Sequence, residues 1–98
     1  MIFFDEHNRI KKLIVQEYQS HDFTCLFDAN PPPTSIYWLM NETTIVSREQ
    51  VAYIPRLTSE HSGIYTCIVE NSLGRVNQSI YLDVQCKFRR FRILFIFL

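Results

Sequence analysis

Residues 57–67 read Leu-Thr-Ser-Glu-His-Ser-Gly-Ile-Tyr-Thr-Cys and hold the most informative pattern in the chain. Gly63, Tyr65 and Cys67 are two residues apart, the spacing that places side chains on one face of a β-strand. A Tyr two residues before a Cys is typical of a strand whose Tyr hydroxyl bonds back to the chain just upstream. The pattern therefore predicts a strand through these three residues, with Tyr65 and Leu57 in the core.

In domains with this pattern a second Cys and a buried Trp lie upstream, and Cys25 and Trp38 occupy those places. The set of Cys25, Trp38, Tyr65 and Cys67 resembles the immunoglobulin superfamily, and the resemblance covers about residues 11–85. It implies an all-β sandwich of two antiparallel sheets with about seven strands, of the I-set or C2 type. It also implies a disulfide between Cys25 and Cys67, with Trp38 packed against it.

Alternating apolar residues predict the other strands of this sandwich. The expected strands are residues 12–16, 21–27, 36–40, 44–47, 51–57, 63–70 and 75–85. Residues 28–34 contain three prolines and predict a stiff, extended loop.

The interval from Trp38 to Cys67 is 29 residues, which is short for this type of domain. We therefore expect strand D to be short or absent, so that residues 51–57 form an edge strand in which Pro55 is tolerated. His61 stands where the family usually has an Asp, and we interpret it as an exposed turn residue rather than a pH switch.

Length and composition indicate the class of protein and the cellular compartment in which it folds. Ninety-eight residues predict one domain, and 47% apolar residues argue against disorder. Ten basic and ten acidic residues cancel, so no nucleic-acid partner is expected. A disulfide between Cys25 and Cys67, which are 42 residues apart, needs an oxidising compartment, so the parent protein is expected to be extracellular or at the cell surface.

The two ends of the chain do not follow the sandwich pattern. Residues 1–10 form a poorly defined N-terminal segment and lack the features of a secretory signal. Residues 86–98 form a basic and apolar tail that is too short to cross a bilayer and is interpreted as truncated or non-native. Cys86 is the odd thiol of the sequence. The chain is therefore interpreted as a fragment of a longer, membrane-anchored protein, or as a product of a wrong gene boundary.

Catalysis is not expected. The sequence has no glycine-rich phosphate loop, no paired metal-ligand motif and no Gly-x-Ser-x-Gly elbow. His7, His21 and His61 are scattered, and no two cysteines are close in sequence. No catalytic, cofactor-binding or metal-binding residues are therefore predicted.

The outward face of the sheet that contains Cys67 is the predicted partner surface. Apolar and aromatic side chains gathered on a sheet face often mark a protein contact, although scattered surface apolar residues and cover by a neighbouring domain or by the tail are alternatives. The candidate residues are Tyr37, Leu39, Thr66, Ile68 and Tyr81. Two glycosylation sequons, at Asn41 and Asn77, frame this face.

Two groups of receptors show more detailed resemblance. Residues 67–74, 77–79 and 82–84 resemble the second ectodomain of fibroblast growth factor receptors, whereas residues 29–32 and 38–39 are more similar to adhesion receptors of the nephrin, sidestep and siglec kinds. The expected function is non-catalytic protein binding in cell adhesion or recognition, with a homophilic or heterophilic protein partner. A receptor tyrosine kinase ectodomain module and an intracellular muscle-scaffold domain remain as alternatives.

Overall fold

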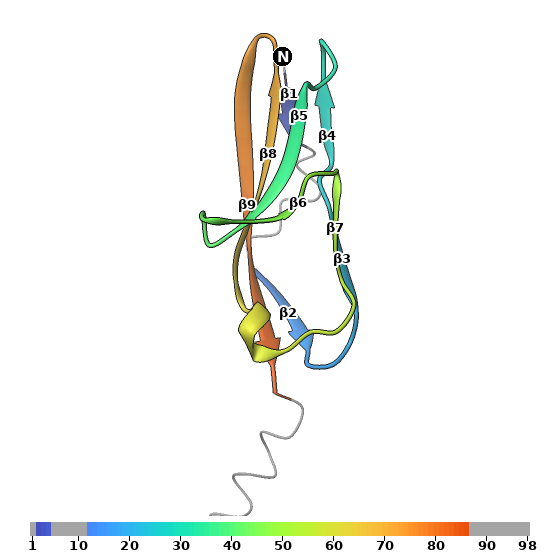
Figure 1. Cartoon of the computed structure of the whole chain (residues 1–98), viewed down its shortest axis with the longest axis vertical. Coiled ribbons are helices and arrows are strands. Elements are labelled where there is room, and N and C mark those ends of the chain that lie inside the picture. Colours follow the sequence, from blue (N-terminus) through green and yellow to red (C-terminus); the bar gives the residue numbers. More distant parts are fainter. Residues whose placement is uncertain (1, 5–11, 87–98) are drawn as a thin grey trace, which may run out of the picture.

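A computed structural model describes residues 2–4 and 12–86 of the chain, which form strands and one short 3-10 helix, Ser59–His61. The strands lie in two layers that face each other across a common core (Figure 1). This is the all-β sandwich that the sequence predicts. Among the described residues, no helix is long and apolar enough to span a membrane.

The larger layer is a five-stranded sheet that carries the Tyr65 and Cys67 strand near its centre. In order, the strands are β2 (Lys12–Gln16), β9 (Gly74–Gln85), β8 (Gly63–Asn71), β5 (Ser35–Met40) and β6 (Thr44–Ser47). The pair β2 and β9 is parallel, and the other three neighbouring pairs are antiparallel. Strand β2 forms one edge of this sheet, and β6 forms the other.

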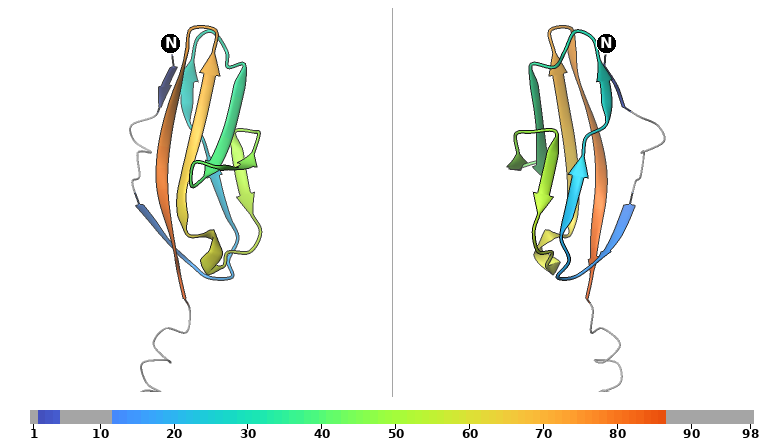
Figure 2. Two further views of the ribbon diagram at one scale, coloured as in Figure 1. Left: turned by 60° about the vertical axis from the view of Figure 1, so that its left-hand side comes forward. Right: turned by 90° about the vertical axis from the view of Figure 1, so that its right-hand side faces the viewer.

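The second layer consists of two antiparallel pairs that follow one another along the sandwich (Figure 2). One pair is β1 (Ile2–Phe4) with β4 (Phe27–Ala29), and the other is β3 (His21–Thr24) with β7 (Val51–Ile54). Ile2 packs against the core, so β1 belongs to the sandwich although it lies within the segment expected to be poorly defined.

The predicted loss of strand D is confirmed for the described residues. Three residues connect β6 to β7, and no strand lies between them. As a result, β7 pairs with β3 alone and forms an edge of its layer, as expected.

Two predicted strands have different limits in the structure. The strand expected over residues 21–27 is interrupted at Cys25, where the side-chain amide of Gln50 donates to the Cys25 carbonyl oxygen at 2.8 Å. Pairing then resumes over Phe27–Ala29, so the start of the predicted loop is strand. The strand expected over residues 51–57 ends at Ile54, because Pro55 has no N–H with which to continue the ladder.

The core fills the space between the layers with side chains from both. Leu57, Tyr65, Val69 and Leu82 are almost completely buried. The remaining buried members of the cluster are Phe23, Cys25, Trp38, Ala52, Cys67 and Val84. Alternation along β8 and β9 therefore divides each strand into a core-facing row and an outward row, and the outward row forms the candidate site.

Candidate functional site

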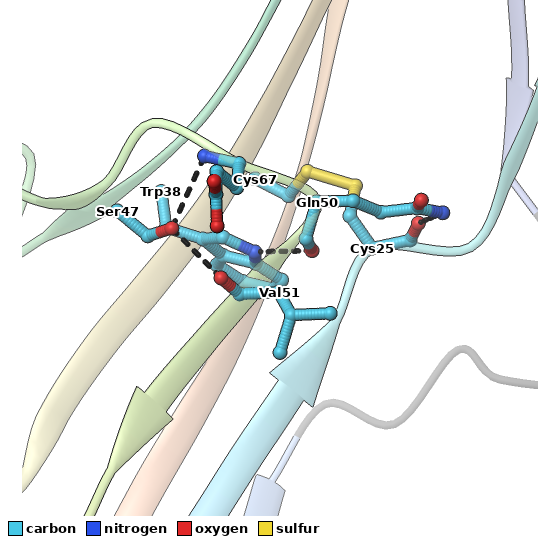
Figure 3. The surroundings of a disulfide bond; sticks show 7 residues. Cys25, Trp38, Ser47, Gln50, Val51 and Cys67 are labelled. Carbon is cyan, nitrogen blue, oxygen red and sulfur yellow. Dashed lines mark hydrogen bonds between the residues drawn. A yellow bond between two sulfur atoms is a disulfide. The ribbon is translucent and has the colours of Figure 1, made fainter.

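A disulfide joins the two layers at the centre of the sandwich. Cys25 follows β3, Cys67 lies in β8, and their Cα atoms are 6.2 Å apart (Figure 3). Both residues are buried. Closing a loop of this length stabilises the fold by about 4 kcal/mol in the chain-entropy account, so the cross-link makes the sandwich a rigid support for its surface.

Trp38 is buried close to the disulfide and is tied to the opposite layer. Its indole Nε1 donates a hydrogen bond of 3.0 Å to the carbonyl oxygen of Gln50 (Figure 3). The ring of Phe23 packs against both Trp38 and Tyr65, with centroid distances of 5.5 and 4.7 Å. The predicted core residues Trp38, Tyr65 and Leu57 thus lie inside the sandwich.

Tyr65 makes the contact that its spacing from Cys67 predicts. Its hydroxyl donates a hydrogen bond of 2.7 Å to the carbonyl oxygen of His61, in the turn that precedes β8. Burial raises the pKa of the Tyr65 phenol, because the interior solvates a phenolate poorly.

The interpretation of His61 as an exposed turn residue is wrong. His61 is half-buried, and its Nδ1 accepts a hydrogen bond of 2.9 Å from the backbone N–H of Thr58. The backbone N–H of His61 in turn donates to the Thr58 carbonyl oxygen at 2.9 Å. The side chain therefore caps the 3-10 helix and supports the carbonyl group that Tyr65 binds.

The outward row of the five-stranded sheet is the surface predicted to bind a partner. The predicted residues lie on one face, since Thr66 pairs with Leu39 and Ile68 pairs with Tyr37 across β8 and β5. However, Thr66 and Ile68 are only 7% and 4% exposed, which corrects their assignment to a solvent-facing surface. Side chains on the flanking strands cover them because β8 is a central strand; for example, the Thr66 hydroxyl lies 2.7 Å from the Ser79 hydroxyl.

Three accessible apolar side chains gather at the end of this face nearest β2, and a fourth, Ile45 on β6, is 42% exposed at the opposite edge, where it pairs with Leu39. Tyr81 and Ile64 are neighbours in the β8–β9 ladder and are each 42% exposed, and Ile14 on β2 is 59% exposed. Tyr37 and Leu39 are half-buried. Ile14 and Ile64 were not predicted, although the same alternation that selected Thr66 and Tyr81 places both on the outer face.

We name the cluster of Ile14, Lys12, Ile64, Tyr81 and Asp83 the β2–β9 corner. The Nζ of Lys12 lies 3.8 Å from the Oδ2 of Asp83 and 6.0 Å from the centroid of the Tyr81 ring. Figure 2 shows β2 alongside the lower part of β9 at one margin of the sheet. The corner therefore combines exposed apolar groups with one cation and one anion.

The two sequon asparagines differ in their surroundings, although both are exposed. Asn77 lies on the outer face of β9, opposite Ile68. Asn41 follows β5 with a φ of 52°, and its Oδ1 accepts a hydrogen bond of 3.0 Å from the backbone N–H of Ile64. The Asn41 side chain therefore extends the β5–β8 ladder by one acceptor.

A hollow of about 260 Å³ opens between β3 and β9. Its wall is largely apolar and includes Leu13, Phe23, Leu26 and Ile80. No three His, Cys, Asp or Glu side chains within residues 2–4 and 12–86 are grouped so as to hold a metal ion. The cysteines that reach this region are joined in the disulfide, so they offer no thiolate for covalent chemistry.

Comparisons with known proteins agree with this architecture. The sequence model described as "Immunoglobulin domain" matches residues 7–71, which is more than half of the chain. Human "Brother of CDO" is 29% identical over 79 residues, which cover 74% of this chain and 7% of that protein.

Solved structures of similar shape include Ig domains of Dscam1 and of titin. The N-terminal four Ig domains of Dscam1 isoform 4.44 superpose with a TM-score of 0.69 at 26% identity, over 76% of this chain and 19% of that one. A chimeric titin Z1Z2 structure superposes with a TM-score of 0.71 at 20% identity, over 88% of this chain and 96% of that one, and shows the fold alone. The chain thus spans a small part of Brother of CDO and about a fifth of the Dscam1 structure.

Proposed function

The chain belongs to the immunoglobulin domain family, and we propose that it is a non-catalytic protein-binding module of a longer cell-surface or secreted protein. The observation that carries this proposal is the gathering of exposed apolar side chains, Ile14, Ile64 and Tyr81, on one face of a cross-linked sandwich. Apolar groups gathered on a rigid surface are typical of protein contacts, and Tyr is enriched in them. The role that fits such a module best is adhesion or recognition between cells.

The Cys25–Cys67 disulfide supports an extracellular location. Disulfides of this kind persist in oxidising compartments and are rare in the cytosol. This favours a receptor or secreted protein over the alternative of an intracellular muscle scaffold. In the parent protein, several such modules in tandem would add avidity to a contact that is weak by itself.

Glycans at Asn41 and Asn77 are part of this proposal. Both side chains are exposed and both sequons lack proline in the middle position. A glycan at Asn77 would cover the end of the outer face near Tyr37 and Ile68, because Asn77 pairs with Ile68. A glycan at Asn41 would begin beside Ile64, whose N–H the Asn41 side chain binds, so the β2 and β9 residues of the corner would be the accessible part of the face.

A binding experiment with matched variants tests the proposal. The oxidised 98-residue chain is displayed as a tetramer on streptavidin and applied to a panel of cells, with and without protease treatment of the cells. Tyr81→Ser and Ile64→Ser should remove protease-sensitive binding. Tyr53→Ser is the control, because Tyr53 is 64% exposed but lies on β7 in the opposite layer.

All variants must first show an intact disulfide and a melting temperature near that of the wild type. Equal loss of binding in the Tyr53 variant, or binding that survives in both outer-face variants, would contradict the assignment of the site to this face.

A further inference from the structure

Four side chains at the β2–β9 corner form an arrangement that is complementary to itself. In the parallel ladder Lys12 pairs with Tyr81, and Ile14 pairs with Asp83. The residues that alternate with them on both strands pack into the core, so all four side chains lie on the outer face. The two charged residues therefore occupy one diagonal of a four-residue block, and Ile14 and Tyr81 occupy the other.

We propose that a second copy of the chain docks on this corner about a two-fold axis along the Ile14–Tyr81 diagonal. The inference rests on the proposed function, because it names the partner of the same face. A two-fold contact is isologous, so each residue meets the image of a residue on its own surface. Ile14 and Tyr81 then lie against their own images, and each Lys12 lies opposite the Asp83 of the second copy.

Electrostatics supports a second copy as the partner. Within one chain the Lys12 side chain is 57% exposed and the Asp83 side chain is 25% exposed, and ion pairs that water reaches in this way contribute little to stability. In the two-fold contact each charge gains a second opposite neighbour, which gives an alternating square of two cations and two anions. The same rotation removes from water the exposed parts of Ile14 and Tyr81, so charge and apolar surface are matched together.

The geometry of the face leaves room for this contact. Asn77 precedes Tyr81 by four residues, so a glycan there would begin about 13 Å away along β9. Ile64 lies beside Tyr81 and extends the apolar surface toward β5. A contact centred on four residues is smaller than the roughly 800 Å² per partner of a stable complex, so the isolated chain should associate weakly and reversibly.

Charge reversal gives the decisive experiment. Sedimentation velocity is measured on the oxidised chain from about 10 μM to about 1 mM, the range in which a contact of this size is expected to populate dimers. Lys12→Asp places acidic residues at both positions 12 and 83, and Asp83→Lys places basic residues at both. Like charges then face each other across the two-fold contact, so each variant alone should self-associate at least about tenfold more weakly than the wild type. An equimolar mixture of the two variants should form a heterodimer, because every charge again faces its opposite.

The doubly substituted chain, Lys12→Asp with Asp83→Lys, should self-associate like the wild type, because the exchange preserves the alternating square. Cross-linking gives an independent measurement in a Cys86→Ser background. Ile14→Cys should form an intermolecular disulfide rapidly, because the axis places the two copies of this position together. Tyr53→Cys, on the opposite layer, should form it slowly.

A wild type that stays monomeric over the whole range, a mixture that does not associate, or equal cross-linking at both positions would overturn the inference. Those outcomes leave the proposed function untouched if the tetramer still binds protease-sensitive sites on cells through Tyr81 and Ile64. Conversely, loss of all cell binding with intact charge-dependent dimers would contradict the proposed adhesion role and leave the dimer standing.

Discussion

The indole of Trp38 and the backbone carbonyl of Gln50 are joined by a hydrogen bond of 3.0 Å that links the two layers beside the disulfide. Gln50 also donates from its side chain to the Cys25 carbonyl oxygen at 2.8 Å. One residue immediately before β7 therefore satisfies both the buried indole and the carbonyl group at the interruption between β3 and β4. The cross-link, the indole and the edge strand form one connected unit.

Substitution of Trp38 should separate packing from hydrogen bonding. Trp38→Ala should lower the free energy of unfolding by about 3–5 kcal/mol, because it leaves a cavity beside the disulfide. Trp38→Phe keeps most of the ring volume but removes the hydrogen bond to the Gln50 carbonyl oxygen, which still accepts from the Cys25 N–H at 3.0 Å, so this variant should cost only about 1 kcal/mol. Urea unfolding of the oxidised proteins measures both values, and a Phe variant as unstable as the Ala variant would show that packing of the ring contributes little.

His61 should contribute to stability through its acceptor nitrogen. His61→Ala removes the acceptor for the Thr58 N–H and should cost about 1 kcal/mol. His61→Asn places an oxygen at the same distance along the side chain, and should recover most of that loss. Thermal unfolding at neutral pH compares the two. An Asn variant as unstable as the Ala variant would indicate that ring packing, and not the cap, is what His61 supplies.

The features that the sequence predicts are those that follow from residue spacing. The period of two along β8 identifies Tyr65 and Cys67 as core-facing, and the upstream Cys25 and Trp38 then have one consistent placement. The missing strand D follows from a count of residues between Trp38 and Cys67. Each of these arguments uses local geometry or chain length, which a sequence contains directly.

Two of the features that were missed depend on contacts between distant segments. Thr66 and Ile68 point outward, but their burial depends on side chains of β5 and β9. The interruption after Thr24 depends on the side chain of Gln50, which is 25 residues from Cys25. These two contacts are set by the tertiary fold and leave no periodic signal. His61 was missed for another reason, because its contact with Thr58 spans three residues and belongs to a local capping box, which alternation does not reveal.

Gly63 should be the glycine that the fold tolerates least. It has a φ of +154°, and a Cβ atom there would lie 2.6 Å from the Oδ1 of Asn41, which accepts from the Ile64 N–H. Gly63→Ala should therefore strain the backbone and displace the Asn41 side chain, at a cost of about 1–3 kcal/mol. The measurement is the free energy of unfolding in urea.

Gly74→Ala is the matched control for Gly63. No atom lies within 4 Å of a Cβ built at Gly74, and its φ is not in the positive range. This variant should be neutral or more stable by up to about 1 kcal/mol, because alanine restricts the unfolded chain. Equal destabilisation at both positions would contradict the assignment of strain to Gly63.

Tyr65 should make the fold sensitive to alkali. Burial raises the pKa of its phenol in the folded state above the ordinary value of 10.0. Below pH 10 the phenol is protonated in both states, so this group causes no dependence on pH. Above pH 10 the unfolded chain loses the proton first, and stability falls until the pH passes the folded-state pKa. The contribution of Tyr65 to the free energy of unfolding should therefore be constant from neutral pH to about pH 9.5 and then decline.

Tyr65→Phe isolates this effect, because the other tyrosines are the same in both proteins. The variant should be less stable at neutral pH by about 1 kcal/mol, since it lacks the hydrogen bond to the His61 carbonyl oxygen. Its decline above pH 10 should be shallower than that of the wild type, so the difference between the two proteins should shrink as the pH rises. Urea unfolding in the Cys86→Ser background measures this without thiol–disulfide exchange between Cys86 and the Cys25–Cys67 disulfide. A constant difference between the two proteins from pH 8 to about pH 11 would contradict the burial of a protonated phenol as the cause.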